Sequence, residues 1–359
     1  MKHLRVLIAG GGTGGHVIPA LAIGRELVAR YDAELRFVGT ERGIETRLVP
    51  EAGFRLELIH VGQLKNVSLK TKLSTLMDLP RGVWRCMELL RSFKPDVVIG
   101  VGGYASGPAM MAAILLRVPT VAYEPNAVPG LANKLVGRFV SAAAVNFPET
   151  AKYFRHAEVT GVPVRQEIFD LPPKHDGPPR LLIFAGSQGA RVFNEMMPQI
   201  VRELLDAVPG LTIVHQAGAR HAEITQAAYA ASRADASRWK VCAFLDDMPA
   251  QYAAADLVLC RSGSTVAELC AAGKPALLVP FPAAADDHQR KNAEVLAKAG
   301  AAVMRIEAGL TPEDLKTELV DLLLDPARLE EMGMRAKAMA KPGAVEKIAA
   351  IVQRLGTRD

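Results

Sequence analysis

The sequence predicts an α/β protein made of two Rossmann-like, doubly wound domains, each built on a parallel sheet. Short apolar runs typical of buried strands alternate with helical patterns along almost the whole chain, as in parallel sheets covered by helices. One opening occurs twice: an apolar strand turns through glycines into a helix at Leu4–Arg30 and again at Arg180–Ala207. The 359 residues also exceed the roughly 250–300 at which single cores stop growing.

The predicted domains are residues 1–163 and 164–340. After Gly161-Val162-Pro163-Val164-Arg165 comes the proline-rich stretch Leu171–Pro179, whose composition is typical of an inter-domain linker. Lys341-Pro342-Gly343 breaks the last helical pattern, and we expect the final helix, within 341–359, to pack back on the first domain. Two such sheets would face a central cleft at their carboxyl edges, where α/β sheets bind ligands.

The elements follow from the apolar runs and their spacing. Strands of the first domain are expected at Leu4–Ala9, Leu35–Val38, Arg55–Ile59, Pro95–Gly100, Val118–Glu124, Ala142–Asn146 and Ala157–Thr160. Helices are expected there near Val17–Arg30 and Ile44–Ala52. In the second domain we expect strands at Arg180–Ala185, Leu211–His215, Val241–Phe244, Leu257–Cys260 and Ala276–Val279, and helices at Arg191–Ala207, Pro326–Ala340 and Gly343–Leu355.

One stretch imitates a membrane span. Val97–Leu116 is 20 residues long and carries no charge, which is enough to cross a bilayer. Its middle contains four glycines and a proline, so a buried strand, a glycine turn and an apolar helix explain it better. The N-terminal apolar run passes straight into a glycine loop, unlike a signal peptide. We therefore expect a protein without a transmembrane helix.

The cysteines favour a reducing compartment. Cys86, Cys242, Cys260 and Cys270 show no C-x-x-C spacing, which argues against a disulfide framework and against a zinc site.

Charge is spread unevenly. The net charge of +5 divides into +7 for residues 1–163 and −2 for residues 164–359. The basic excess concentrates in Lys65–Lys94, where seven basic and two acidic residues alternate with apolar ones. This segment is either a solvated helix face over an ordinary core or a surface for anionic lipid headgroups, where each basic residue contributes about 1 kcal/mol. No nucleic-acid motif or aromatic platform is present, so we expect no nucleic-acid partner.

The first glycine loop, Gly10–His16, is the leading candidate site. Amide groups at such a helix start, together with the helix dipole, favour an anion, usually phosphate. The loop also fits the G-x-G-x-x-G dinucleotide pattern, but the second strand ends in Gly39-Thr40 rather than in the acid that would hold a ribose. We interpret it as a phosphate loop with His16 as a catalytic histidine, and nicotinamide binding is the second choice.

Similar loops follow other predicted strands. Val101–Pro108 is a second glycine turn in the first domain, and two such loops would suit two linked phosphates. Gly186–Ala190 repeats the phosphate-loop pattern in the second domain. Cys260–Glu268 is either an ordinary capped helix start or a diphosphate site whose carboxylate suits ribose hydroxyls. Pro280–Gln289 is either a polar surface loop or a sugar-binding loop.

The sequence gives little support to a metal site or another cofactor. It contains neither D-x-D nor H-E-x-x-H, and the side chains of the adjacent pairs Asp246-Asp247 and Asp286-Asp287 point apart on most backbones. We expect a diphosphate leaving group to be stabilised by helix N-termini and basic side chains instead.

Six ordered motifs carry a resemblance. They are G-G-T-G-G-H at Gly11–His16, G-G-Y-x-S-G-P at Gly102–Pro108, G-S-Q-G-A at Gly186–Ala190, R-S-G at Arg261–Gly263, T-V-x-E at Thr265–Glu268 and D-H-Q at Asp287–Gln289. Together they resemble the MurG family of glycosyltransferases, which add N-acetylglucosamine (GlcNAc) to the lipid-linked muramyl peptide of peptidoglycan. The resemblance covers nearly the whole chain. It implies a GT-B architecture, with the lipid acceptor on the first domain and UDP-GlcNAc on the second.

The resemblance also implies roles for individual residues. His16 would lie beside the reacting hydroxyl, and the other substrate-binding residues of the first domain would be Thr13, Gly14, Gly15, Gly103, Tyr104 and Asn126. Those of the second domain would be Arg165, Ser187, Gln188, Gly189, Leu245, Ser264, Thr265, Val266, Ala267, Glu268, His288 and Gln289. Among them, Ser187 would contact the phosphates, the Leu245 backbone the uracil and Glu268 the ribose. His288 and Gln289 would read the sugar hydroxyls.

The implied reaction is an inverting transfer. The muramyl C4 hydroxyl of the undecaprenyl-linked acceptor, lipid I, attacks the anomeric carbon of UDP-GlcNAc, UDP leaves, and a β-1,4 link forms. His16 is the candidate general base, because an unperturbed imidazole titrates near neutrality; a structural histidine that orients the loop is the alternative.

The resemblance implies a peripheral enzyme on the cytoplasmic face of the bacterial inner membrane, with cell-wall or division proteins as possible partners. Three other functions stay open at this point. One is a UDP-sugar 2-epimerase of the same fold, and another is a non-catalytic nucleotide-sugar binder at the membrane. The third, an NAD-dependent oxidoreductase, is disfavoured by Gly39-Thr40.

Overall fold

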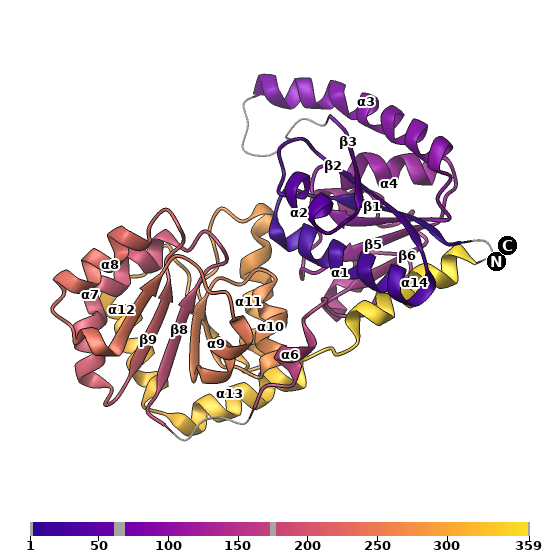
Figure 1. The fold of residues 1–359 in the computed structure, drawn as a ribbon. Coiled ribbons are helices and arrows are strands. Elements are labelled where there is room, and N and C mark those ends of the chain that lie inside the picture. The colour runs from indigo at the N-terminus through magenta and orange to yellow at the C-terminus, as the bar shows by residue number, and fades with distance from the viewer. Residues whose placement is uncertain (1–2, 61–68, 173–176, 358–359) are drawn as a thin grey trace. The chain divides into compact units, whose positions relative to one another are not determined.

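The computed structural model describes residues 3–60, 69–172 and 177–357, and their side chains except those of 69–78. The chain divides into two compact units (Figure 1). Unit 1 contains Met1–Pro163 together with Gly343–Asp359, and unit 2 contains Val164–Pro342. Each unit is a parallel sheet with helices, so the predicted fold class is confirmed for both.

Unit 1 contains a seven-stranded parallel sheet with the order β3-β2-β1-β4-β5-β6-β7. Its strands are β1 (Arg5–Gly10), β2 (Glu34–Gly39), β3 (Arg55–Leu58), β4 (Val97–Gly102), β5 (Thr120–Glu124), β6 (Ala142–Val145) and β7 (Ala157–Val159). The strand order reverses direction between β1 and β4, which pair directly. Both glycine loops of this unit therefore begin at the switch point, where ligands of doubly wound sheets bind.

Helices cover both faces of this sheet. They are α1 (Gly14–Tyr31), α2 (Glu45–Glu51), α3 (Leu69–Phe93), α4 (Ser106–Leu115), α5 (Leu131–Val136) and α14 (Ala344–Gly356), with a 3₁₀ turn η1 (Pro148–Tyr153). Alternate residues of β1 enter opposite cores: Val6 and Ile8 pack with α1 and α14, whereas Leu7 and Ala9 pack with α3 and α4. Because helices cover both faces, the central strands β1, β4, β5 and β6 are nearly continuous apolar runs.

The uncharged stretch Val97–Leu116 forms β4, the glycine turn and α4, as expected. Within the residues described, no helix is both long enough and apolar enough to cross a membrane. The basic segment Lys65–Lys94 forms α3 from Leu69 onward. Its first residues, 65–68, and its side chains up to 78 lie outside the described part of the chain.

Unit 2 contains a six-stranded parallel sheet with the order β10-β9-β8-β11-β12-β13. Its strands are β8 (Arg180–Phe184), β9 (Thr212–Gln216), β10 (Trp239–Cys242), β11 (Leu257–Cys260), β12 (Ala276–Leu278) and β13 (Ala302–Met304). The switch point falls between β8 and β11. Its helices are α6 (Gln166–Phe169), α7 (Arg191–Ala207), α8 (Ala222–Ala231), α9 (Met248–Ala254), α10 (Thr265–Ala272), α11 (His288–Lys298), α12 (Pro312–Leu323) and α13 (Pro326–Ala338), with 3₁₀ turns η2 (Ala236–Arg238) and η3 (Ala285–Asp287).

Two expectations need correction in unit 2. The stretch Leu171–Pro179, of which 173–176 lie outside the described residues, falls inside unit 2 and does not separate the units. The chain enters unit 2 earlier because α6 packs on α9 and α10, and the Lys337 Nζ donates to the Phe169 carbonyl. The strand β13 was not expected, although its apolar run Ala301–Met304 is as long as the predicted run Ala276–Val279.

Candidate functional site

In unit 1, the loops that follow β1 and β4 pack directly against each other. The Gly11 amide donates to the Gly102 carbonyl at 3.3 Å. A Cβ on Gly103, whose φ is +81°, would lie 2.3 Å from the Gly11 carbonyl oxygen. Only glycine permits this approach of two backbones, and the two predicted glycine loops therefore form one structure.

His16 ends the first of these loops, and its ring contacts both. Its Nδ1 is 3.1 Å from the Gly11 carbonyl oxygen, and a Cβ on Gly102 would lie 2.9 Å from its imidazole ring. A carbonyl oxygen only accepts hydrogen bonds, so Nδ1 must carry the proton. In the neutral ring the lone pair is then on Nε2, the arrangement that a general base requires.

A carboxylate occupies the anion position of the first loop. Glu45, the first residue of α2, is 1% exposed, and its Oε2 accepts from the Gly12 amide at 2.8 Å. Its Oε1 accepts from the Thr40 amide and hydroxyl at 2.9 and 3.0 Å. The amides of Gly11 and Gly12 are therefore already hydrogen-bonded within the chain, and the phosphate interpretation does not hold for this part of the loop.

The remaining predicted residues of unit 1 lie at the same carboxyl edge. Thr13 is exposed at the N-cap of α1 without capping through its side chain, followed by the partly exposed Gly14 and Gly15. Tyr104 is 38% exposed in the loop after β4. Asn126 follows β5, and its backbone amide and Nδ2 both donate to Glu124 Oε1, at 3.1 and 3.0 Å.

Glu124 is a buried carboxylate that organises the Asn126 loop. It is 3% exposed, and its Oε2 accepts from the Gly130 amide and from the Asn133 Nδ2, both at 3.0 Å. Burial raises the pKa of the Glu124 carboxyl, and the hydrogen bonds from Asn133, Asn126 and Gly130 act in the opposite direction. The side chain of Asn126 is thereby held in one orientation at the strand end.

In unit 2, the loop after β8 is built in the same way as the loops of unit 1. Gly189 has φ of +69°, and a Cβ there would lie 2.0 Å from the Ala217 carbonyl oxygen. The Gln216 side chain donates to the Gly186 carbonyl at 2.7 Å. Ser187 and Gln188 lie exposed at the tip of this loop, where they are accessible to a ligand.

The turn after β11 begins α10, and Glu268 lies on its first turn. Ser264 occupies the N-cap position and Thr265 the first helical position, but no side-chain capping hydrogen bond is made. The ordinary capping explanation of Ser264 is therefore wrong. Val266 is buried, whereas Ala267 is partly exposed on the same turn.

Glu268 has a buried phenol and an arginine as neighbours. The Tyr252 hydroxyl donates to Glu268 Oε2 at 2.8 Å, and Tyr252 itself is 0% exposed. Burial raises the pKa of Glu268, while the Tyr252 hydrogen bond and the positive charge of Arg165 lower it. Arg165 is exposed at the N-cap of α6. The cluster combines a partly buried carboxylate with a cation, groups that suit a ribose and a phosphate.

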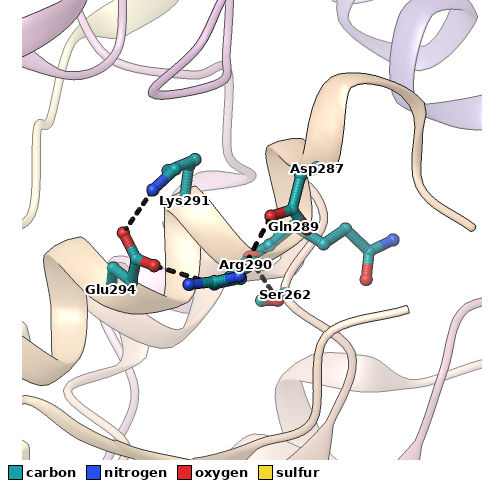
Figure 2. A network of polar contacts seen from close by, with 6 residues as sticks. All are labelled: Ser262, Asp287, Gln289, Arg290, Lys291 and Glu294. Atoms are coloured by element: carbon teal, nitrogen blue, oxygen red, sulfur yellow. Dashed lines mark hydrogen bonds and ion pairs between the residues drawn. The ribbon is translucent and has the colours of Figure 1, made fainter. Parts of the chain in front are cut away.

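His288 and Gln289 begin α11, and polar contacts fix this helix start. The Gln289 carbonyl accepts from the Ser262 hydroxyl at 2.7 Å, and its side-chain Oε1 accepts from the Phe281 amide at 3.0 Å. Figure 2 shows the Gln289 side chain pointing away from the cluster of Asp287, Arg290 and Glu294. The His288 Nδ1 donates to the Ala285 carbonyl at 2.7 Å.

The last predicted residue, Leu245, follows β10. Its side chain is buried, whereas that of the preceding Phe244 is 55% exposed. Within residues 3–60, 69–172 and 177–357, no group of three or more His, Cys, Asp or Glu residues could hold a metal ion.

Sequence reasoning missed four residues that organise these loops: Glu45, Glu124, Gln216 and Tyr252. Glu45, Gln216 and Tyr252 contact segments distant in sequence, whereas Glu124 contacts residues two to nine positions further along the chain; no motif around any of them signals the role. A partial signal existed for Glu45, because an acid in the first turn of a helix near a glycine loop interacts favourably with backbone amides.

Two family domains match the chain. The glycosyltransferase family 28 N-terminal domain matches residues 6–145, and the family's C-terminal domain matches residues 180–348. A protein of Anaeromyxobacter dehalogenans (strain 2CP-C) is 46% identical over 99% of this chain and 94% of its own length. A protein of Syntrophotalea carbinolica is 43% identical over 99% of this chain and 100% of its own length. Both are named UDP-N-acetylglucosamine–N-acetylmuramyl-(pentapeptide) pyrophosphoryl-undecaprenol N-acetylglucosamine transferase.

Solved structures agree with this assignment. The crystal structure of Acinetobacter baumannii MurG has a TM-score of 0.84 and 33% identity, covering 98% of this chain and 99% of that one. A putative UDP-N-acetylglucosamine 2-epimerase from Listeria monocytogenes has a TM-score of 0.71 at 16% identity over 100% of this chain and 98% of that one, and so shares the fold alone. The chain belongs to glycosyltransferase family 28, in the MurG group of N-acetylglucosamine transferases.

Proposed function

We propose that this protein transfers GlcNAc from UDP-GlcNAc to the C4 hydroxyl of undecaprenyl-pyrophosphoryl-MurNAc-pentapeptide, lipid I, with inversion, to give lipid II for peptidoglycan synthesis. The observation that carries the proposal is the hydrogen bond from His16 Nδ1 to the Gly11 carbonyl. It occurs in a chain that is 46% identical, over 99% of the chain's own length, to a protein named as this transferase. Because this bond keeps the proton on Nδ1, the lone pair of the neutral ring is on Nε2, and the ring lies at the carboxyl edge of the sheet of unit 1. A base that deprotonates an attacking hydroxyl requires such a lone pair.

Unit 2 would hold the donor. Glu268, oriented by Tyr252, accepts hydrogen bonds from the two ribose hydroxyls, and Arg165 adds a positive charge beside it. Ser187 and the residues Ser264–Ala267 bind the diphosphate through hydroxyls and the N-terminus of α10, which favours negative charge as UDP departs. Gln289 reads the sugar hydroxyls. Neither a metal nor another cofactor is required in this scheme.

Unit 1 would bind peripherally to the cytoplasmic face of the membrane. Large apolar side chains are exposed on α3, α4 and α5, of which α4 packs against both others: Trp84 is 62% exposed, Leu115 65%, Leu135 60% and, just after α5, Phe139 70%. Exposed basic residues accompany them, including Arg85, Arg117, Lys134 and Arg138. Apolar side chains flanked by basic ones suit a bilayer with anionic headgroups. An association with cell-wall or division proteins stays a prediction from the resemblance.

Acceptor-dependent release of UDP tests the proposal. With UDP-GlcNAc and lipid acceptor the protein should release UDP, and without acceptor it should release almost none. His16→Ala should lower kcat about 10²–10⁴-fold, the usual contribution of a general base, without changing the Kd for UDP-GlcNAc. Conversion of UDP-GlcNAc without acceptor would instead indicate the epimerase, and tight binding without any turnover a nucleotide-sugar binder.

A further inference from the structure

We infer that Glu45 is a positioning residue for the transfer: it holds the first glycine loop in the shape that fixes the tautomer of His16. This inference rests on the proposed function, because it concerns the base of that reaction. Glu45 is not part of any motif described above and is separated from His16 by 29 positions in the sequence.

The Glu45 carboxylate uses both oxygens on backbone and hydroxyl donors of two different loops. Oε2 accepts from the Gly12 amide, and Oε1 accepts from the Thr40 amide and hydroxyl, at distances of 2.8 to 3.0 Å. The residue is 1% exposed, so these bonds form largely out of water, where hydrogen bonds to a charged group are strong. The carboxylate therefore ties the loop after β1 to the loop after β2.

Three glycines make room for this carboxylate. A Cβ would lie 2.1 Å from a Glu45 carboxylate oxygen if built on Gly11, and 1.8 Å if built on Gly43; on Gly39 it would lie 2.5 Å from Glu45 Cγ. Distances this short do not occur, so any side chain at these positions would expel Glu45. The glycine content of this edge thus serves an internal carboxylate.

The loop that Glu45 holds is the loop that orients His16. The Gly12 amide donates a hydrogen bond to Glu45. Gly12 directly follows Gly11, whose carbonyl accepts a hydrogen bond from His16 Nδ1. Gly12 has φ of +91°, and the peptide between the two glycines sets the direction of that carbonyl. Loss of the Glu45 contact would let this peptide rotate, and His16 would lose the partner that keeps its lone pair on Nε2.

Glu45→Gln is the primary test because it keeps the shape of the side chain. An amide presents one NH₂ group, which would face either the Gly12 or the Thr40 donors without accepting from them. We expect kcat to fall about tenfold or more, since misplacing a catalytic group by a small distance has effects of that size. The KM for UDP-GlcNAc should change less than twofold. Glu51→Gln, an exposed position at the end of the same helix, is the matched control and should behave like the wild type.

A double-mutant cycle separates positioning from general damage. In a His16→Ala background, Glu45→Gln should lower the remaining activity less than twofold, because its effect passes through the missing imidazole. An equal loss in both backgrounds, or full activity of the single variant, would overturn the inference. Should Glu45→Gln fail to fold, Thr40→Val removes only the hydroxyl donor and enters the same cycle, with an expected loss of about twofold to fivefold.

A spectroscopic readout keeps this inference distinct from the proposed function. The ¹⁵N resonances of the His16 ring, identified by their loss in His16→Ala, report the tautomer whether or not the protein turns over. We expect the Nδ1–H form in the wild type and a mixture in Glu45→Gln. An unchanged tautomer in the variant would refute the role of Glu45, whereas an inactive wild type with the expected spectra would refute only the transfer.

Discussion

Tyr252 donates its phenolic proton to Glu268 Oε2 at 2.8 Å, from a position with no exposed surface. The bond joins the end of α9 to the first turn of α10, and the Tyr252 ring packs edge-on against Phe184 with ring centroids 6.0 Å apart. The phenol thus fixes one carboxylate oxygen of Glu268, and the direction in which the other oxygen points is fixed with it.

Removing this hydroxyl should weaken the binding of the nucleotide. Tyr252→Phe keeps the packed ring, and we expect the Kd for UDP to rise about 10–150-fold, since a hydrogen bond to a charged group contributes about 1.5–3 kcal/mol. Tyr229→Phe is the control: this phenol, also 0% exposed, contacts His215 Nδ1 at 3.0 Å. Calorimetric titration with UDP measures both variants. Equal affinities of Tyr252→Phe and the wild type would remove Glu268 orientation from the account.

Glu268→Gln should stabilise the free protein while weakening nucleotide binding. Burial raises the pKa of Glu268 in the folded state, so ionisation of this carboxyl lowers the free energy of unfolding. The contribution of the protonated form is fully present below the unfolded pKa and is lost as pH rises through the folded pKa. The variant avoids the loss, and we expect its Tm at neutral pH to exceed that of the wild type by about 2–4 °C.

The pH dependence gives this prediction its sign. The difference in Tm should shrink as pH falls toward the ordinary pKa of a glutamate, where the wild-type residue is protonated too. Thermal unfolding followed by circular dichroism at several pH values measures it. A variant that is less stable at neutral pH, or a difference that grows in acid, would contradict the prediction.

Transfer should proceed without a divalent cation. Helix N-termini, Ser187 and Arg165 supply the groups that stabilise the departing diphosphate in our proposal, so chelation with EDTA should change kcat less than about twofold. Initial rates with EDTA, Mg²⁺ and Mn²⁺ in parallel measure this. Activity that is lost on chelation and restored only by Mn²⁺ would require a metal in the reaction.

The exposed apolar residues of unit 1 should control membrane binding. Leu135→Ser together with Phe139→Ser should weaken binding to vesicles containing anionic lipid about tenfold or more, because each large side chain loses about 1.5–3 kcal/mol of burial. Sedimentation with such vesicles measures the effect. The control pair Ile224→Ser and Met334→Ser removes equally exposed apolar residues from unit 2 and should leave binding unchanged. Undiminished binding by the first pair would place the membrane contact elsewhere.

The fold could be predicted because its central strands are buried on both faces. Runs such as Leu257–Cys260 and the amphipathic helix Arg191–Ala207 have the same bounds in the structure as in the prediction. The strand Ala302–Met304 was missed although its apolar run is equally long, because apolar runs of this length also occur inside helices. The linker was misplaced because proline content marks an irregular segment and does not reveal that the residues before it, in α6, already pack on α9 and α10.

The candidate loops could be predicted from the sequence, but the residues that hold them in place, such as Glu45, could not. Motif spacing pointed to His16, Gly189, Glu268 and Gln289 as candidates because glycine loops at strand ends have a local signature; their roles stay predictions. Motif spacing did not reveal that the carboxylate of Glu45 accepts the hydrogen bond of the Gly12 amide, which was predicted to bind a phosphate. That contact depends on the distance between two loops 33 residues apart, which spacing does not determine.

Incubation with UDP-[¹⁴C]GlcNAc and purified undecaprenyl-pyrophosphoryl-MurNAc-pentapeptide tests the central claim most directly. The account predicts that the label enters the lipid fraction in amounts equal to the UDP released. It also predicts that NMR of the isolated product shows a β link to C4 of the muramyl residue. Label that stays in the aqueous fraction, or a link formed with retained configuration, would contradict it.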